Sequence, residues 1–154
     1  MDRLNFRIVI EAQRETVWRT MLGEDTYRIW TGPFMPGSHY VGDWSEGSRM
    51  LFLAPDNGGE MGMVSRIKMI RLHEHVSIEH LGIVQNGKED TSSDAAREWA
   101  GALENYTFKD RGDGTEVLVE MDTSETYREM FEETWPKALR RLRELAEGEE
   151  GTGT

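Results

Sequence analysis

Residues 124–145 read SETYREMFEETWPKALRRLREL, and their pattern decides the fold. The apolar and aromatic residues recur at helical spacing. Together they form one wide stripe: Tyr127, Met130, Phe131, Thr134, Trp135, Ala138 and Leu142. Ser124 can cap the helix, and the arginines near its other end suit the C-terminal pole of the helix dipole. We predict one long C-terminal helix whose apolar side packs on another layer.

The preceding residues supply strands that can receive this helix. Residues 4–10 alternate in polarity like a strand, and two short helical patterns follow, one after Ala12 that stops at Gly23 and one over residues 25–30. Further strands, separated by turn residues, are predicted at 38–41, 49–54, 62–70, 74–81, 83–90, 103–109 and 117–121. The pair Asn86-Gly87 indicates a hairpin. This order predicts an α+β fold: a curved antiparallel sheet of six to seven strands wrapped around the long C-terminal helix, with two short helices after the first strand.

Length and charge limit the classes of protein to which the chain can belong. Its 154 residues suffice for one domain, predicted at residues 1–146 and followed by a flexible acidic tail at residues 147–154. The net charge of −11 disfavours nucleic acid and anionic membrane surfaces as partners. Cysteine is absent, and no segment has the length and polarity of a signal peptide or a membrane span. We therefore expect a cytoplasmic protein without stable membrane insertion.

Alternation along the strands predicts which side chains face the long helix. Charged residues of one parity turn the other parity inward, which assigns these residues to the inner face: Met63, Ser65, Ile67, Met69, Val76, Ile78, His80, Glu104, Tyr106 and Phe108. A buried polar group needs a partner, because leaving it unpaired costs roughly 1–3 kcal/mol. His80 and Glu104 therefore either pair with each other, with water or with the backbone, or they orient a bound ligand.

Signals for metal, cofactor or nucleophilic chemistry are weak in this sequence. His73-Glu74-His75 places two histidines on one face, whereas His80 has the opposite parity, and a metal site needs three or four donors. No phosphate loop, dinucleotide fingerprint or nucleophile motif occurs. We expect no metal, no cofactor and no assigned catalytic residue. Acid–base chemistry by Glu104 and His80 stays open, although two residues do not define a mechanism.

A set of motifs spread along the chain resembles a known superfamily. They are Phe6, Val17-Trp18, Tyr27 with Trp30, Gly42-Asp43-Trp44 with Glu46-Gly47-Ser48, IEHLG at 78–82, Trp99 with ENYT at 104–107, and WPKAL at 135–139. In these motifs residues 3–146 resemble the SRPBCC (START-like, helix-grip) superfamily, and within it the branch related to the C-terminal domain of the activator of the heat-shock ATPase chaperone. The resemblance implies a single START-like domain with a deep hydrophobic cavity. Members bind lipids, sterols, polyketides and other apolar molecules, and some are enzymes.

We therefore expect this chain to bind a small apolar or aromatic molecule, lipid-like or polyketide-like, in a cavity between the sheet and the C-terminal helix. The residues expected to line this cavity are Trp30, Phe52, Met63, Ser65, Ile78, His80, Glu104, Tyr106, Tyr127, Phe131 and Trp135. Apolar burial would supply affinity, and His80 and Glu104 would orient the ligand. Within the helix, Tyr127 and Phe131 are the better pocket candidates, whereas Trp135 and Leu142 fit the core.

Two other functions remain open at this point. The first is an enzyme of the polyketide-cyclase or hydrolase type that uses Glu104 and His80, which we favour less than a binding protein. The second is a protein-interaction module that acts with a chaperone, which predicts an exposed apolar patch outside the cavity. The resemblance implies that co-chaperones of this branch carry an additional N-terminal domain, which this sequence lacks, so a chaperone partner is not expected. A homodimer is left open.

Overall fold

Antiparallel strand pairs build the whole sheet of this protein. The computed structural model describes the backbone of residues 1–152 and the side chains of residues 1–149. The elements in chain order are β1 (Asp2–Ile10), α1 (Arg14–Leu22), α2 (Glu24–Trp30), β2 (His39–Val41), β3 (Arg49–Asp56), β4 (Gly59–Arg71), β5 (His75–Gln85), β6 (Lys88–Asp90), α3 (Asp94–Trp99), β7 (Leu103–Arg111), β8 (Gly114–Thr123) and α4 (Glu125–Thr152). The predicted α+β class, the long C-terminal helix and the two short helices after the first strand are confirmed.

The strand order of the sheet is β1-β8-β7-β5-β4-β3-β2, and β6 pairs with β5 alone. The described residues thus form eight strands, against the six to seven predicted. The additional strand is the three-residue β6, which the Asn86-Gly87 turn folds back onto β5. Both turn residues have positive φ, 51° and 75°, as the predicted hairpin requires. The short helix α3 follows β6, and Ser93 caps it because its hydroxyl accepts the backbone N–H of Ala96.

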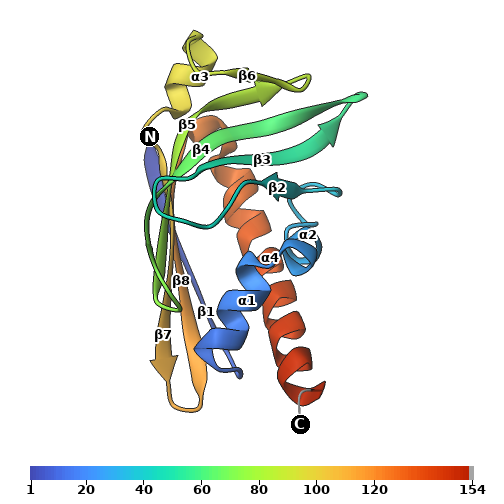
Figure 1. The fold of residues 1–154 in the computed structure, drawn as a ribbon, viewed down its shortest axis with the longest axis vertical. Coiled ribbons are helices and arrows are strands. Elements are labelled where there is room, and N and C mark those ends of the chain that lie inside the picture. Colours follow the sequence, from blue (N-terminus) through green and yellow to red (C-terminus); the bar gives the residue numbers. More distant parts are fainter. Residues whose placement is uncertain (153–154) are drawn as a thin grey trace.

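The helix α4 lies along one face of the sheet, with α1 and α2 beside it (Figure 1). Its predicted apolar stripe contributes three residues to the core: Trp135, Ala138 and Leu142 are buried there. They share this core with Val119 and Met121 of β8, whose alternate positions are buried, and Trp135 contacts Met121 directly. Burying a leucine such as Leu142 stabilises the fold by roughly 1.5–3 kcal/mol. The helix therefore closes the core from the side opposite the sheet.

The end of α4 differs from the prediction. The helix was expected to stop at Leu145, but it continues to Thr152. Two acidic side chains hold this extension, because a Glu147 carboxylate oxygen accepts the backbone N–H of Glu11 at 2.9 Å and Glu149 pairs with Arg19 at 2.8 Å. The predicted boundary at residue 146 thus falls inside α4, and residues 153 and 154 of the predicted tail lie outside the described residues.

A bulge in β4 reverses one predicted orientation. Ile67 and Met69 pair with consecutive residues of β5, so Lys68 is an extra residue in its strand. Met69 was predicted to face inward, and this prediction is wrong: its side chain is 37% exposed. Ile70 packs against the core in its place. Simple alternation fails here because one unpaired residue shifts the parity of all residues that follow it.

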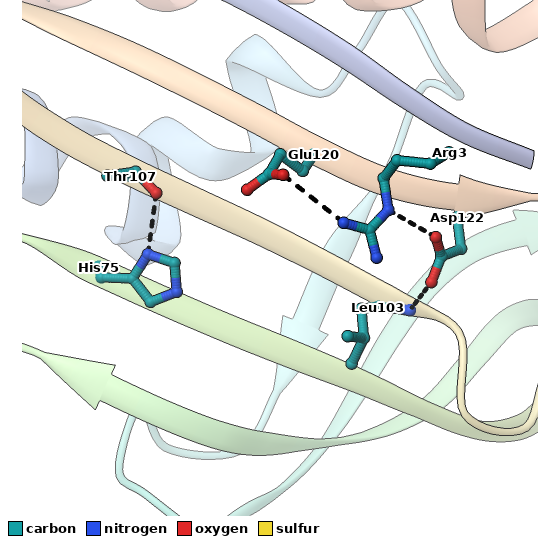
Figure 2. A network of polar contacts seen from close by, with 6 residues as sticks. All are labelled: Arg3, His75, Leu103, Thr107, Glu120 and Asp122. Carbon is teal, nitrogen blue, oxygen red and sulfur yellow. Dashed lines mark hydrogen bonds and ion pairs between the residues drawn. The ribbon is translucent and has the colours of Figure 1, made fainter.

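The sheet face opposite α4 carries polar side chains that join neighbouring strands. Figure 2 shows Arg3 of β1 between Glu120 and Asp122 of β8, with its Nε donating to Asp122 at 2.7 Å and its Nη1 3.5 Å from Glu120. The second Asp122 oxygen accepts the backbone N–H of Leu103 in β7 at 2.9 Å. Burial raises the pKa of Asp122, but the hydrogen bonds from Arg3 and Leu103 outweigh burial and bring this pKa below its ordinary value. One carboxylate thus ties three strands together.

Candidate functional site

A cavity of about 720 Å³ lies between the sheet and α4. Residues from α2, α3, β3, β4, β5, β7 and α4 contribute to its wall, and most of them are apolar or aromatic. Nine of the residues predicted to line a cavity do so: Trp30, Phe52, Met63, His80, Glu104, Tyr106, Tyr127, Phe131 and Trp135. Its size falls in the range of roughly 300–1,000 Å³ that is usual for small-molecule sites.

Two other predicted lining residues, Ser65 and Ile78, are not part of this wall. Both face inward as predicted, but both are buried under other side chains, with exposures of 0% and 1%. Ile78 belongs to the core cluster. Ser65 lies behind His80, and its hydroxyl is 2.7 Å from the imidazole Nδ1. Strand parity therefore predicted correctly that these two residues face inward, but it did not predict that other side chains cover them.

The polar wall residues form one connected group. His80 in β5 places its Nε2 3.7 Å from Oε1 of Glu104 in the adjacent strand β7. The other Glu104 oxygen accepts a hydrogen bond from the Tyr106 hydroxyl. Burial, followed by the negative charge of Glu104, raises the pKa of Tyr106 well above its ordinary value, so this phenol stays a donor. His80 and Glu104 therefore face each other and the cavity at the same time.

Several aromatic rings line the wall around this polar group. Trp135 lies at their centre, with ring centroids 6.1 Å from Tyr106, 5.9 Å from Trp30 and 5.0 Å from Phe34. The indole N–H of Trp135 points at the sulfur of Met121 at 2.9 Å, which fixes the ring in the core. Trp135 thus belongs to the core, as predicted, and it also lines the cavity.

The mouth of the cavity lies at the start of α4. Tyr127 is 46% exposed there, and its ring is 5.8 Å from that of Trp99 in α3. Phe131, one turn later, is partly buried and is 6.2 Å from Phe34. Tyr127 and Phe131 thus line the cavity, as predicted for the first half of the helix, whereas Leu142 is fully buried in the core.

Sequence reasoning missed several wall residues, among them Tyr27, Phe34, Met61, Ile83 and Trp99. Tyr27 and Trp99 belong to the motifs behind the family resemblance, so a signal for them was present. Ile83 was hidden by a second bulge, because the pairing of β4 with β5 skips Leu81. The extra residue turns Ile83 to the same side as His80. Phe34 lies in an irregular segment, where periodicity carries no information.

Metal binding and membrane insertion gain no support from the structure. Within residues 1–149, whose side chains the structure describes, no group of three or more His, Asp or Glu side chains could hold a metal ion. His75, one of the two histidines in the weak motif, instead contacts the Thr107 hydroxyl at 2.8 Å on the outer face (Figure 2). None of the helices in the described part of the chain combines the length and apolar character needed to cross a membrane.

Comparisons with known proteins agree on the fold. A family model described as Activator of Hsp90 ATPase homolog 1-like protein matches residues 11–147. A protein from Nitrosomonas europaea has a similar structure, with a TM-score of 0.74, 16% identity and coverage of 98% of this chain and 99% of that one. A protein from Cytophaga hutchinsonii follows with a TM-score of 0.70, 20% identity and coverage of 98% and 97%.

The Aha1 dimer from Colwellia psychrerythraea is also similar, with a TM-score of 0.67, 18% identity and coverage of 96% of this chain and 97% of that one. At identities of 16–20%, these similarities concern the fold alone. No curated protein matches the sequence of this chain.

Proposed function

The chain belongs to the family of Activator of Hsp90 ATPase homolog 1-like proteins, of the SRPBCC type, and from this premise we propose that it binds a small apolar or aromatic molecule in the cavity between the sheet and α4. The single observation that carries this proposal is the cavity itself, about 720 Å³ in volume, with a mainly apolar wall and a few convergent polar groups. Apolar burial supplies affinity, at roughly 25 cal/mol per Å² before the costs of binding.

The polar group at the wall supplies orientation in this proposal. His80 and Glu104 are both largely buried and both line the cavity. Each has one protein partner that holds its side chain, Ser65 for His80 and Tyr106 for Glu104. A ligand that satisfies the remaining hydrogen-bonding capacity of these groups gains specificity, because an unmatched ligand leaves them desolvated and unpaired.

Native mass spectrometry of freshly purified protein tests the proposal. A bound ligand appears as a mass above the 17.7 kDa chain that is lost on denaturation. Titration with the neutral apolar dye Nile red provides an independent measurement, with saturable fluorescence enhancement expected at one site. Empty protein together with no saturable dye binding would contradict a ligand-binding function.

An enzyme that uses Glu104 and His80 is the second candidate, and the 3.7 Å approach of their side chains is the observation that favours it. The small-molecule fraction of a cell extract, incubated with the wild-type protein and with Glu104→Gln, tests this candidate by mass spectrometry. A compound consumed by the wild-type protein alone would support catalysis. Equal metabolite profiles would contradict it and leave a binding function.

A chaperone-directed interaction module is supported less well. The exposed apolar residues outside the cavity come from separate elements, with Val9 in β1, Val41 in β2 and Leu72 in the β4–β5 turn. A homodimer is a separate question, raised by the dimeric relative from Colwellia psychrerythraea. Light scattering decides it, since a dimer has twice the 17.7 kDa mass of one chain.

A further inference from the structure

We propose that the ligand of this cavity is an organic cation, an aromatic or apolar molecule with a protonated amine, and that Glu104 is its anchor. This inference rests on the proposed ligand-binding function and specifies the chemical class of the ligand. Three observations carry it: the sign of the charges on the wall, the position of the carboxylate among aromatic rings, and the placement of three basic residues of α4 elsewhere.

Acidic residues supply most of the charged groups on the cavity wall, and among the described residues the basic residue beside them there is His80, 3.7 Å from Glu104. Glu104 lies inside the cavity, and Asp56 and Glu98 are exposed residues that also contribute to its wall. Within the described part of the chain, the lining includes neither lysine nor arginine, and Asp56 and Glu98 form no ion pair. A fourth acidic residue, Asp122, has its carboxylate engaged by Arg3 and Leu103. The wall is therefore negative and attracts a cation.

The Glu104 carboxylate lies where an ammonium group could meet it and the aromatic faces together. Tyr106 donates to one Glu104 oxygen, and the Tyr106 ring is 6.1 Å from the Trp135 ring. Tyr27 is close enough to Glu104 that, after burial, the negative charge of this carboxylate is the largest cause that raises the Tyr27 pKa. Carboxylates combined with aromatic rings bind ammonium groups, because the charge and the ring quadrupoles attract the same cation.

His80 leaves this accepting capacity available. Its Nε2 is 3.7 Å from Glu104 Oε1, which is longer than a hydrogen bond. A ligand N–H can therefore approach the same oxygen from the cavity. A ligand carboxylate, by contrast, would meet Glu104 with no lysine or arginine in the described lining to pair with it, and like charges at close range in a partly buried site repel strongly.

Three basic residues of α4 face a different part of the surface. Lys137, Arg140 and Arg141 surround a separate hollow of about 510 Å³ next to Gly32 and Pro33. The same helix thus presents aromatic residues to the cavity and cations to this other hollow. The absence of lysine and arginine from the described cavity wall is therefore a property of the arrangement, and it disfavours the fatty-acid type of ligand that such a residue would anchor.

Three ligands that share one ring system test the inference by isothermal titration calorimetry: naphthylmethylamine, naphthalenemethanol and naphthoate. The amine should bind about tenfold or more tightly than the alcohol, and the alcohol more tightly than naphthoate. Equal or tighter binding of the alcohol or of naphthoate would overturn the inference and leave the proposed function standing. If none of the three binds saturably, the proposed function fails together with the inference.

The variant Glu104→Gln keeps the shape of the side chain and removes its charge. It should bring the affinity for the amine to within about threefold of that for the alcohol. Glu129→Gln is the matched control, because it removes one charge from an exposed position of α4 outside the wall and should keep the preference. If the ratio of the affinities for the amine and the alcohol in Glu104→Gln equals that of the wild-type protein, the proposed role of Glu104 is wrong. The wild-type series does not depend on how well either variant folds.

Discussion

His80 and Glu104 face each other across the β5–β7 pair, with Nε2 and Oε1 3.7 Å apart. Each side chain is held by one partner: Ser65, which lies behind His80, contacts its Nδ1, and Tyr106 of the cavity wall donates to Glu104. The two residues are thus fixed in orientation while their facing atoms remain accessible from the cavity. This relationship connects the stability of the sheet with the chemistry of the site.

Removing the partner of His80 should destabilise the protein. In Ser65→Ala the imidazole Nδ1 loses its 2.7 Å contact in a fully buried place. The free energy of unfolding is expected to fall by about 1–3 kcal/mol, because a buried polar atom is left unpaired. Urea denaturation measures this change. Ser92→Ala, at an exposed position, is the control and should change stability by less than about 0.5 kcal/mol; equal effects of the two variants would contradict the prediction.

Two parts of α4 should have different roles: residues near its start should support ligand binding, and residues near Leu142 should support stability. Leu142→Ala removes a fully buried side chain and should lower the free energy of unfolding by about 2–5 kcal/mol without changing affinity for Nile red. Tyr127→Ala removes a 46% exposed ring at the cavity mouth, so it should cost less than about 1 kcal/mol but weaken dye binding about fivefold. If Tyr127→Ala mainly reduces stability, the division of the helix is wrong.

His75, on the outer face of the sheet, should make the free energy of unfolding depend on pH near neutrality. Burial lowers the pKa of His75 below its ordinary value, and Arg71 lowers it further, while Glu120 opposes them. The folded state therefore binds a proton at His75 less readily than the unfolded state does. Stability is fully present above the unfolded pKa of about 6.5 and is lost as pH falls below it towards the lower folded pKa.

His75→Gln removes this titration and keeps a polar group near Thr107. The urea midpoint of the wild-type protein should fall relative to that of His75→Gln as the pH decreases from about 7 to about 5. The comparison between the two proteins cancels the other titrating groups. A difference in midpoint that stays constant over this range would refute the assignment.

The extension of α4 beyond Ala146 should stabilise the fold modestly. A chain that ends after Ala146 loses the contact of Glu147 with the Glu11 backbone and the pair between Glu149 and Arg19. Because the ion pair is exposed, we expect a loss of about 1 kcal/mol, seen as a melting temperature lower by about 2–4 °C. Arg19→Gln in the full chain should reproduce part of this loss. An unchanged melting temperature would show that residues 147–154 behave as a dispensable tail.

Local patterns in the sequence were sufficient for the architecture. The stripe of α4 and the turn at Asn86-Gly87 depend on neighbouring residues alone, so periodicity and turn chemistry predicted both. Nine of the eleven residues predicted to line the cavity line it, because strand parity and helix spacing determine a face. Parity failed at Met69 and gave no assignment for Ile83, and each of these residues follows a bulge that only the pairing of two strands reveals.

The sequence by itself thus determined the main helices and strands and, away from the bulges, which faces turn inward, because these depend on contacts within a few residues along the chain. Only the tertiary structure decided that Ser65 lies behind His80, that Tyr27 and Phe34 join the wall, and that the wall carries acidic side chains but no lysine or arginine among the described residues. How deeply a side chain is buried, and which side chains it contacts, depend on packing between residues far apart in the chain. No local pattern encodes the distance between His80 and Glu104.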